Sequence, residues 1–248
     1  MVIIVENDDR IKKRFIELAN KSYNQGIYTF TDFLGLNEQN LFSEIESEIK
    51  YVKYNKFGGT LDCERVMIRF GDEEELRYEQ NYPIKCIVVK PILQKFADKL
   101  SHKDFLGALM NLGITREKLG DIVIHENIGY IFCEEQISDY IIDNLNKVKH
   151  TSVSVEIEDR ETNISDLYKD NYKSQAVIVD SERLDAIIAK AYKISRTTST
   201  SLFKANKVFV NGKVCTSNSQ LIKVNDVISV RGKGRIKYLG NKNPLEKY

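Results

Sequence analysis

Four basic side chains near the end of the chain stand at alternate positions: Arg231, Lys233, Arg235 and Lys237. In an extended strand successive side chains point to opposite faces, so this spacing predicts that all four share one face. A row of fixed positive charges is suited to contacting the phosphates of a nucleic acid. A solvated Lys and Arg surface is the common alternative, and the regular spacing argues against it.

The charge of the chain is distributed unevenly around this row. The 248 residues carry 37 Lys and Arg against 36 Asp and Glu, a net charge of +1. Residues 180–248 hold 14 of the basic and five of the acidic residues, so their net charge is +9 and that of residues 1–179 is −8. A small basic segment joined to an acidic body is typical of nucleic-acid binding.

Candidate contacts to phosphate or ribose in this segment are its basic and small polar side chains. Ser195 and Asn211 also have local explanations, as a helix cap and a turn residue. The predicted RNA-binding residues are Arg183, Ser195, Arg196, Lys204, Lys207, Asn211, Lys213, Arg231, Lys233, Arg235 and Lys237.

Two helices and a hairpin are expected to position these side chains. Ser181 is suited to cap a first helix, whose apolar residues recur at helical spacing from Leu184 to Ala191. Ser195 is suited to cap a second helix. Asn211-Gly212 lies between alternating apolar residues, which predicts a two-residue hairpin turn with positive φ at both positions.

This segment resembles the S4 domain, an RNA-binding module, in Arg183 to Asp185, Ser195-Arg196, Leu202, Val208 to Val214 and Asp226 to Val230. The resemblance implies that the two helices and the hairpin edge form a basic surface for structured RNA. Asn206 stands where the family usually has Gly, and Asn is the next best residue for a left-handed helix end. The Thr and Ser run at 197–201 has poor helix propensity, which predicts a second helix that is short or frayed in isolation.

The middle region, residues 81–158, predicts the order β-α-β-β-α-β, the split arrangement of RRM-like, ferredoxin-like domains. Ser101 and Asp104 predict a capping box ahead of the first helix. Tyr130 and Phe132 lack the neighbours of an RNA-recognition motif, so we interpret them as packing residues. The expected strands are 82–89, 122–125, 128–133 and 151–157, and the expected helices are 105–112 and 136–148.

The expected fold class is α+β with several domains, of which residues 1–80 form a small mixed domain, with helices at 8–23 and 37–51 and a strand at 65–70. Gly58-Gly59 is expected to form a turn, because no Lys-Ser or Lys-Thr pair follows to make a phosphate loop. His102 and Arg116 are expected to serve local structure in turns. Residues 159–179 are expected to link the middle region to the last domain at 180–248, with some order at 164–168.

Four cysteines, Cys63, Cys86, Cys133 and Cys215, stand at least 23 positions apart. This spacing predicts neither a metal site nor a disulfide framework, which favours a reducing cytoplasm. No apolar run approaches the ~20 residues of a membrane span, so no membrane partner is expected. We expect no cofactor.

Further motifs extend the resemblance to nearly the whole chain: Phe57-Gly58-Gly59, His102 to Met110, Leu112 to Lys118, Gly120 to Ile122 and Arg231 to Arg235. They resemble the bacterial YlmH-like proteins, which combine a small N-terminal domain, an RRM-like middle domain and a C-terminal S4 domain. The resemblance implies a cytoplasmic RNA-binding protein of Gram-positive type, encoded near division genes. It further implies contact with the large ribosomal subunit carrying peptidyl-tRNA, in rescue of stalled ribosomes, with rRNA and tRNA as partners. We expect a monomer.

S4 domains also occur on enzymes. Pseudouridine synthases place a catalytic Asp in an Arg-Leu-Asp context, but here Asp185 lies inside the S4-like segment and is expected to pair with a nearby Arg or Lys. No glycine-rich loop follows a strand, as a methyltransferase requires, and no nucleophile–base set stands out. We therefore expect a non-enzymatic RNA binder. The alternatives are a protein–protein adaptor linked to cell division and an RNA-modifying enzyme that carries an S4 domain.

Overall fold

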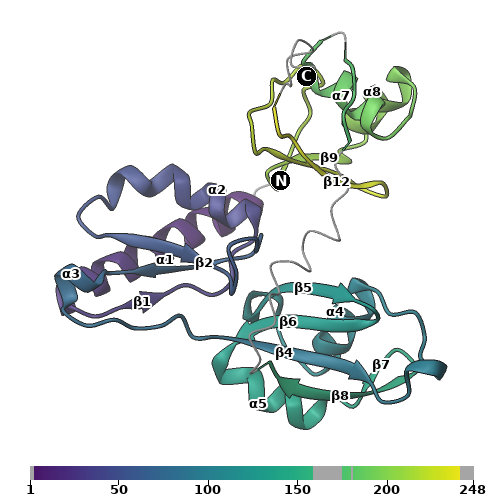
Figure 1. Cartoon of the computed structure of the whole chain (residues 1–248). Helices are drawn as coiled ribbons and strands as arrows, with labels where there is room; N and C mark the ends of the chain where they lie inside the picture. Colours follow the sequence, from purple (N-terminus) through teal and green to yellow (C-terminus); the bar gives the residue numbers. More distant parts are fainter. Residues whose placement is uncertain (1–2, 159–174, 180, 241–248) are drawn as a thin grey trace, which may run out of the picture. The chain divides into compact units, whose positions relative to one another are not determined.

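The computed structural model describes residues 3–158, 175–179 and 181–240 (Figure 1). Contacts divide the chain into two compact units, residues 1–172 and 173–248. Most of the expected linker, including the expected order at Ile164 to Tyr168, lies outside the described residues. None of the described helices combines the length and the apolar character needed to cross a bilayer.

The N-terminal part of the first unit packs two helices on a small sheet. Helix α1 spans Ile3–Gln25 and α2 spans Leu36–Ile45, followed by a 3-10 turn at Glu46–Glu48. The antiparallel sheet has the order β1-β3-β2. Its strands are β1 (Thr29–Phe30), β2 (Tyr54–Phe57) and β3 (Met67–Phe70), and the short helix α3 (Glu73–Leu76) follows.

Apolar side chains from both helices and from β3 form the core of this part, with Phe15, Leu18, Leu41, Phe42 and Phe70 buried. The two predicted helices and the strand are therefore confirmed. The strand β2 was not predicted, because its sequence Tyr-Asn-Lys-Phe places polar residues at its centre. The second helix is shorter than predicted.

The middle part carries a five-stranded antiparallel sheet of order β5-β6-β4-β8-β7. Helices α4 (His102–Asn111) and α5 (Glu135–Asn144) pack on it around Phe105, Leu109 and Ile141. The strands are β4 (Ile84–Pro91), β5 (Leu119–His125), β6 (Ile128–Glu134), β7 (Lys147–Val148) and β8 (Thr151–Ile157), with 3-10 turns at Gln94–Phe96 and Arg116–Lys118.

Two local predictions in the middle part are confirmed and one is corrected. The predicted capping box is present: the Asp104 carboxylate accepts from the Ser101 amide at 2.8 Å, and the Ser101 side chain faces the Asp104 amide. The Ser101 hydroxyl also donates to the Asp104 carboxylate at 2.6 Å. The strands predicted at 122–125 and 128–133 form a hairpin, whose turn residues Glu126 and Asn127 both have positive φ. The helix predicted to reach Val148 ends at Asn144, because the next residue is extended and Lys147–Val148 pairs with β8.

The N-terminal part packs directly on one face of the middle sheet. Phe33 and Met67 are buried against Val123 and Phe132 in a separate apolar cluster, to which Tyr130 also packs. Gly59 has φ +112°, and a Cβ there would lie 2.2 Å from the Phe132 ring. The packing role predicted for Tyr130 and Phe132 is confirmed, and Gly59 is needed for close approach.

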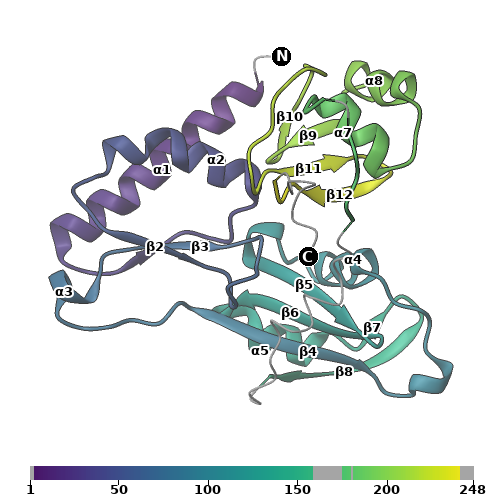
Figure 2. The ribbon, with the colours of Figure 1, turned by 45° about the horizontal axis from the view of Figure 1, so that its top comes forward.

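The second unit packs two helices on a four-stranded antiparallel sheet of order β10-β9-β11-β12. Its core includes Leu184, Ile188, Phe203, Val208 and Ile228. Figure 2 shows the two helices beside each other on this sheet. The elements are α7 (Leu184–Ala191), α8 (Arg196–Lys204), β9 (Val208–Val210), β10 (Lys213–Val214), β11 (Val227–Val230) and β12 (Gly234–Lys237).

The predicted caps of this unit have different outcomes. The Ser195 hydroxyl accepts from the Thr198 amide at 3.0 Å, so the cap of α8 is confirmed. Ser181 does not cap α7, because that helix begins at Leu184 after an extended Arg183. Asn206 has φ 51°, as predicted for a left-handed helix end.

The hairpin prediction is confirmed, whereas the prediction of a basic strand is wrong. Asn211 and Gly212 have φ values of 49° and 81° between β9 and β10. Residues 231–237 were predicted to form one extended strand, but Arg231 to Lys233 form a turn between β11 and β12. Gly232 at φ 84° and Gly234 at φ 115° allow the chain to reverse there. The four basic residues therefore do not share one strand.

Candidate nucleic-acid interface

A buried carboxylate holds two of the predicted RNA-binding arginines. Asp185 in α7 is 2% exposed, and it accepts from Arg183 Nε at 3.1 Å and from Arg196 Nε at 3.4 Å. Burial alone would raise the pKa of Asp185, but the hydrogen bonds and charges of Arg183 and Arg196 bring that pKa below its ordinary value. The pairing predicted for Asp185 is confirmed, and it fixes both guanidinium groups where α7 and α8 begin.

The second helix is tied to the first by its small polar residues. The Ser199 hydroxyl is fully buried and donates to the Asp185 carbonyl at 2.8 Å. The hydroxyls of Thr200 and Ser201 donate to carbonyls one turn back, at 2.9 and 2.7 Å. These bonds hold nine residues of α8 in a helix, so the Thr and Ser run is not frayed in this structure.

The hairpin places Asn211 and Lys213 differently. The Asn211 side-chain amide donates to Asp226 at 2.8 Å, and its side-chain oxygen accepts from the Val227 amide at 2.9 Å. Asn211 therefore joins the hairpin to β11. Lys213 is exposed on the edge strand β10. Any role of either residue in RNA binding stays a prediction.

A basic junction connects the end of α8 to the sheet. Lys204 and Lys207 are exposed on either side of the left-handed Asn206. The Lys207 carbonyl accepts from the Arg231 amide at 2.8 Å, which brings the β11–β12 turn against this junction. The Arg231 guanidinium carbon lies 5.3 Å from the centre of the Phe209 ring, a cation–π distance.

The sheet face turned away from the helices carries most of the remaining basic side chains. Ser229 pairs with both Phe209 and Arg235 across neighbouring strands, so these three side chains share that face. Arg235 donates to the Ser229 hydroxyl at 3.2 Å. Lys237 lies two residues on, on the same face, and Lys233 is exposed in the turn.

The structure thus brings seven of the eleven predicted residues into two sets and leaves Lys204, Asn211, Lys213 and Lys233 outside them. The helix-start set consists of Arg183, Ser195 and Arg196. The sheet-face set, with Lys207 at its rim, consists of Lys207, Arg231, Arg235 and Lys237. Phe209 was missed as a possible stacking partner, although its place between two buried valines, Val208 and Val210, marks it as outward-facing.

On the middle sheet of the first unit, the N-terminal part covers Phe132 and Val123, so these side chains are not open to bases. Arg116 acts locally, as predicted: its Nη1 donates to the carbonyls of Leu119 at 2.7 Å and Gly120 at 3.0 Å. Burial, with the nearby Arg65 charge, lowers the pKa of Arg116 to about 10.

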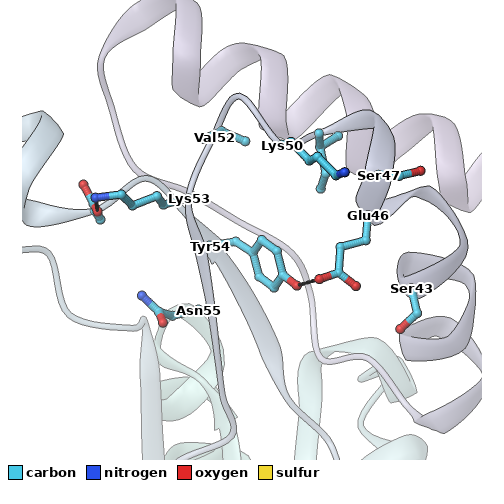
Figure 3. A pocket seen from close by; sticks show the side chains of 10 residues that line it. Ser43, Glu46, Ser47, Lys50, Val52, Lys53, Tyr54 and Asn55 are labelled. Atoms are coloured by element: carbon cyan, nitrogen blue, oxygen red, sulfur yellow. Dashed lines mark hydrogen bonds and ion pairs between the residues drawn. The ribbon is translucent and has the colours of Figure 1, made fainter.

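One pocket of about 640 Å³ lies between α2 and β2 (Figure 3). Several of its polar groups are paired with one another: the Tyr54 hydroxyl donates to the Glu46 carboxylate, and Lys53 forms an ion pair with Asp72 at 2.5 Å. The Ser43 hydroxyl donates to the Gln39 carbonyl at 3.1 Å. Nothing in this pocket activates a nucleophile, and no three His, Cys, Asp or Glu side chains within the described ranges are grouped to hold a metal.

Comparison with known proteins agrees with this geometry. The family model of the putative RNA-binding domain in YlmH matches residues 78–163, and the S4 domain model matches residues 182–228. The chain is 31% identical over 213 residues to the Ribosome-associated protein quality control protein P2 of Bacillus subtilis (strain 168). The aligned region covers 83% of this chain and 78% of that protein.

A solved structure, the cell division protein ylmH from Streptococcus pneumoniae, is similar with a TM-score of 0.49 and 21% identity. That likeness covers 61% of this chain and 91% of the other. The two matched RNA-binding domain families and the extended similarity to the Bacillus subtilis protein are therefore the basis for assignment. This chain belongs to the YlmH-like family of RNA-binding proteins with a C-terminal S4 domain.

Proposed function

We propose that this protein is a non-enzymatic, ribosome-associated factor that binds rRNA and tRNA on the large ribosomal subunit during quality control of stalled ribosomes. The observation that carries the proposal is the coincidence of the S4 match at 182–228 with the +9 charge of residues 180–248. The Bacillus subtilis relative is named as ribosome-associated, which supports the same partner here. The proposal includes a cytoplasmic location and a monomeric state.

In this proposal the second unit contacts RNA through phosphates rather than through base sequence. The helix-start arginines are held in place by Asp185, and a fixed planar guanidinium is well suited to bidentate phosphate contacts. The sheet-face set adds positive charge beside Phe209, on which an unpaired base can stack. Contacts of this kind position a protein on structured RNA and are tolerant of sequence.

We also propose a three-domain division: residues 1–80, an RRM-like domain at 81–158, a linker at 159–179 and the S4 domain at 180–248. The family matches at 78–163 and 182–228 support these boundaries. The strand order β5-β6-β4-β8 supports the RRM-like assignment, because it is the order of a βαββαβ sheet. The N-terminal part would then occupy the sheet face on which RRM domains usually stack bases.

The salt dependence of RNA binding tests the main proposal. If six of the nine basic side chains among the predicted residues neutralise phosphates, log affinity falls with log salt at a slope of roughly −4 to −5. Anisotropy of a fluorescent rRNA hairpin, titrated with the full chain at several KCl concentrations, gives this slope. Lys237→Ala should reduce the slope by about one, whereas the exposed Lys103→Ala in α4 should leave it unchanged. A slope near zero for the unaltered chain would refute the proposal.

A second candidate function is a protein–protein adaptor linked to cell division. The observation in its favour is the net charge of −8 on residues 1–179, which is unsuited to RNA as a whole. In that case the acidic unit binds the partner and the S4 domain only determines where the complex is located.

A further inference from the structure

The first unit has a negative net charge, but one of its grooves is lined by more basic than acidic side chains. The groove has a volume of about 820 Å³ and lies between α1, the β1–α2 connection and the turn that precedes β5. Its lining includes the basic residues Arg10, Lys13, Arg14, Arg65 and Arg116 and the acidic residues Glu17, Asp32, Glu38 and Glu117.

The basic residues of α1 form one stripe along the groove. Arg10, Lys13 and Arg14 are spaced by three and four residues, so they lie on the same helix face, and all three are exposed. The neighbouring stripe, with Phe15 and Leu18, is buried in the core and fixes the rotation of the helix. The charged stripe therefore has one orientation, toward the groove.

The two arginines of the groove floor are held by carbonyl oxygens. Arg65 donates to the Phe33 carbonyl at 2.7 Å and to the Leu119 carbonyl at 2.9 Å, and Arg116 donates to Leu119 at 2.7 Å. These hydrogen bonds set the positions of the two guanidinium groups, and nearby carboxylates, among them Asp121 and Glu117, offset part of their charge.

Two of the four carboxylates are engaged by other cations. Glu17 lies 3.7 Å from Arg14, and Asp32 lies 2.8 Å from Lys118. The other two, Glu38 and Glu117, act on Arg65, whose pKa is lowered by burial. Five basic side chains on fixed elements still line the groove, and three of them are exposed along α1, so the groove is suited to an anionic ligand.

We propose that this groove is a second RNA-binding site, which holds the phosphate backbone of an RNA strand between the α1 stripe and the floor arginines. The proposal depends on the function proposed above, because RNA is the polyanion expected beside this protein. Arg is better suited than Lys to phosphate, because its planar donors match two phosphate oxygens at once. Bound RNA would then contact both units of the chain.

The test compares two double variants of the full chain, each lacking two exposed basic side chains. Arg10→Ala with Lys13→Ala removes charge from the groove, and Lys21→Ala with Lys99→Ala removes it elsewhere in the same unit. With a fluorescent rRNA hairpin as the probe, the groove variant should show a salt slope smaller by about two, and the control should match the unaltered chain. Circular dichroism melting verifies that both variants fold.

The outcomes separate this proposal from the main one. No salt-dependent binding by the unaltered chain would overturn the main function. Normal binding by the unaltered chain with equal slopes for both variants would overturn the groove alone. If the groove variant loses binding to a poly-glutamate peptide but binds RNA with the same salt slope as the unaltered chain, the groove proposal is overturned, because the groove then binds an acidic protein instead. Ultraviolet cross-linking of the hairpin to the unaltered chain should also modify the peptide that contains residues 10–14.

Discussion

Asp185 shows how one side chain can organise an RNA-binding surface without touching RNA. Its carboxylate is buried, yet it joins two arginines that are about half exposed, Arg183 and Arg196. An arginine that is already oriented loses less conformational entropy when a phosphate binds. The same triplet, Arg-Leu-Asp, is therefore explained by positioning, and no catalytic role is needed to account for it.

Asp185→Asn tests this positioning role. We expect the full chain to lose about 2 kcal/mol of unfolding free energy at neutral pH, because two hydrogen bonds to a buried charge are weakened. The folded-state pKa of Asp185 is below its ordinary value, so its stabilisation is complete above about pH 5 and declines as the pH falls below about 4. Urea unfolding at several pH values measures the difference. An equal loss at about pH 3 and at neutral pH would contradict the ion-pair account, and Asp139→Asn, on the exposed face of α5, provides the control.

At the scale of elements, periodicity and turn chemistry predicted most of the fold. The hairpin at Asn211 and the cap at Ser195 depend on residues near them in sequence, and both were correct. The basic strand at 231–237 was wrong, because alternation of charge is also compatible with a turn that contains two glycines. The sheet-face set could not be found from one strand, since it requires the register of β9, β11 and β12.

Gly59→Ala tests how closely the N-terminal part packs on the middle sheet. Gly59 has φ +112°, which strains any residue that carries a Cβ, and the new Cβ would lie 2.2 Å from the Phe132 ring. We therefore expect the unfolding free energy to fall by about 2–4 kcal/mol. Gly107→Ala is the matched control, because a Cβ there meets nothing within 4 Å inside α4 and should add about 0.5–1 kcal/mol. Thermal or urea unfolding of the full chain measures both changes. Equal stability of the two variants would mean that the two parts do not pack as described.

At the scale of the whole molecule, the chain joins a unit of negative net charge to one of positive net charge. The positive charge of residues 180–248 is expected to raise the rate of encounter with RNA and to lower the rate of encounter with basic proteins. The net charge of residues 1–179 is negative, whereas the lining of the groove beside α1 holds five basic and four acidic side chains. We therefore expect the body to repel RNA except at this groove.

Capture of partners from a cell extract, before and after nuclease treatment, distinguishes the two functions at this scale. If RNA is the direct ligand, ribosomal proteins captured with the full chain should be lost after nuclease digestion, because they are held through RNA. High salt should release them as well, since counterions compete for the same phosphates. A protein bound to the acidic unit should instead survive the nuclease. Retention of one non-ribosomal protein, with ribosomal proteins absent from the untreated sample, would favour the adaptor.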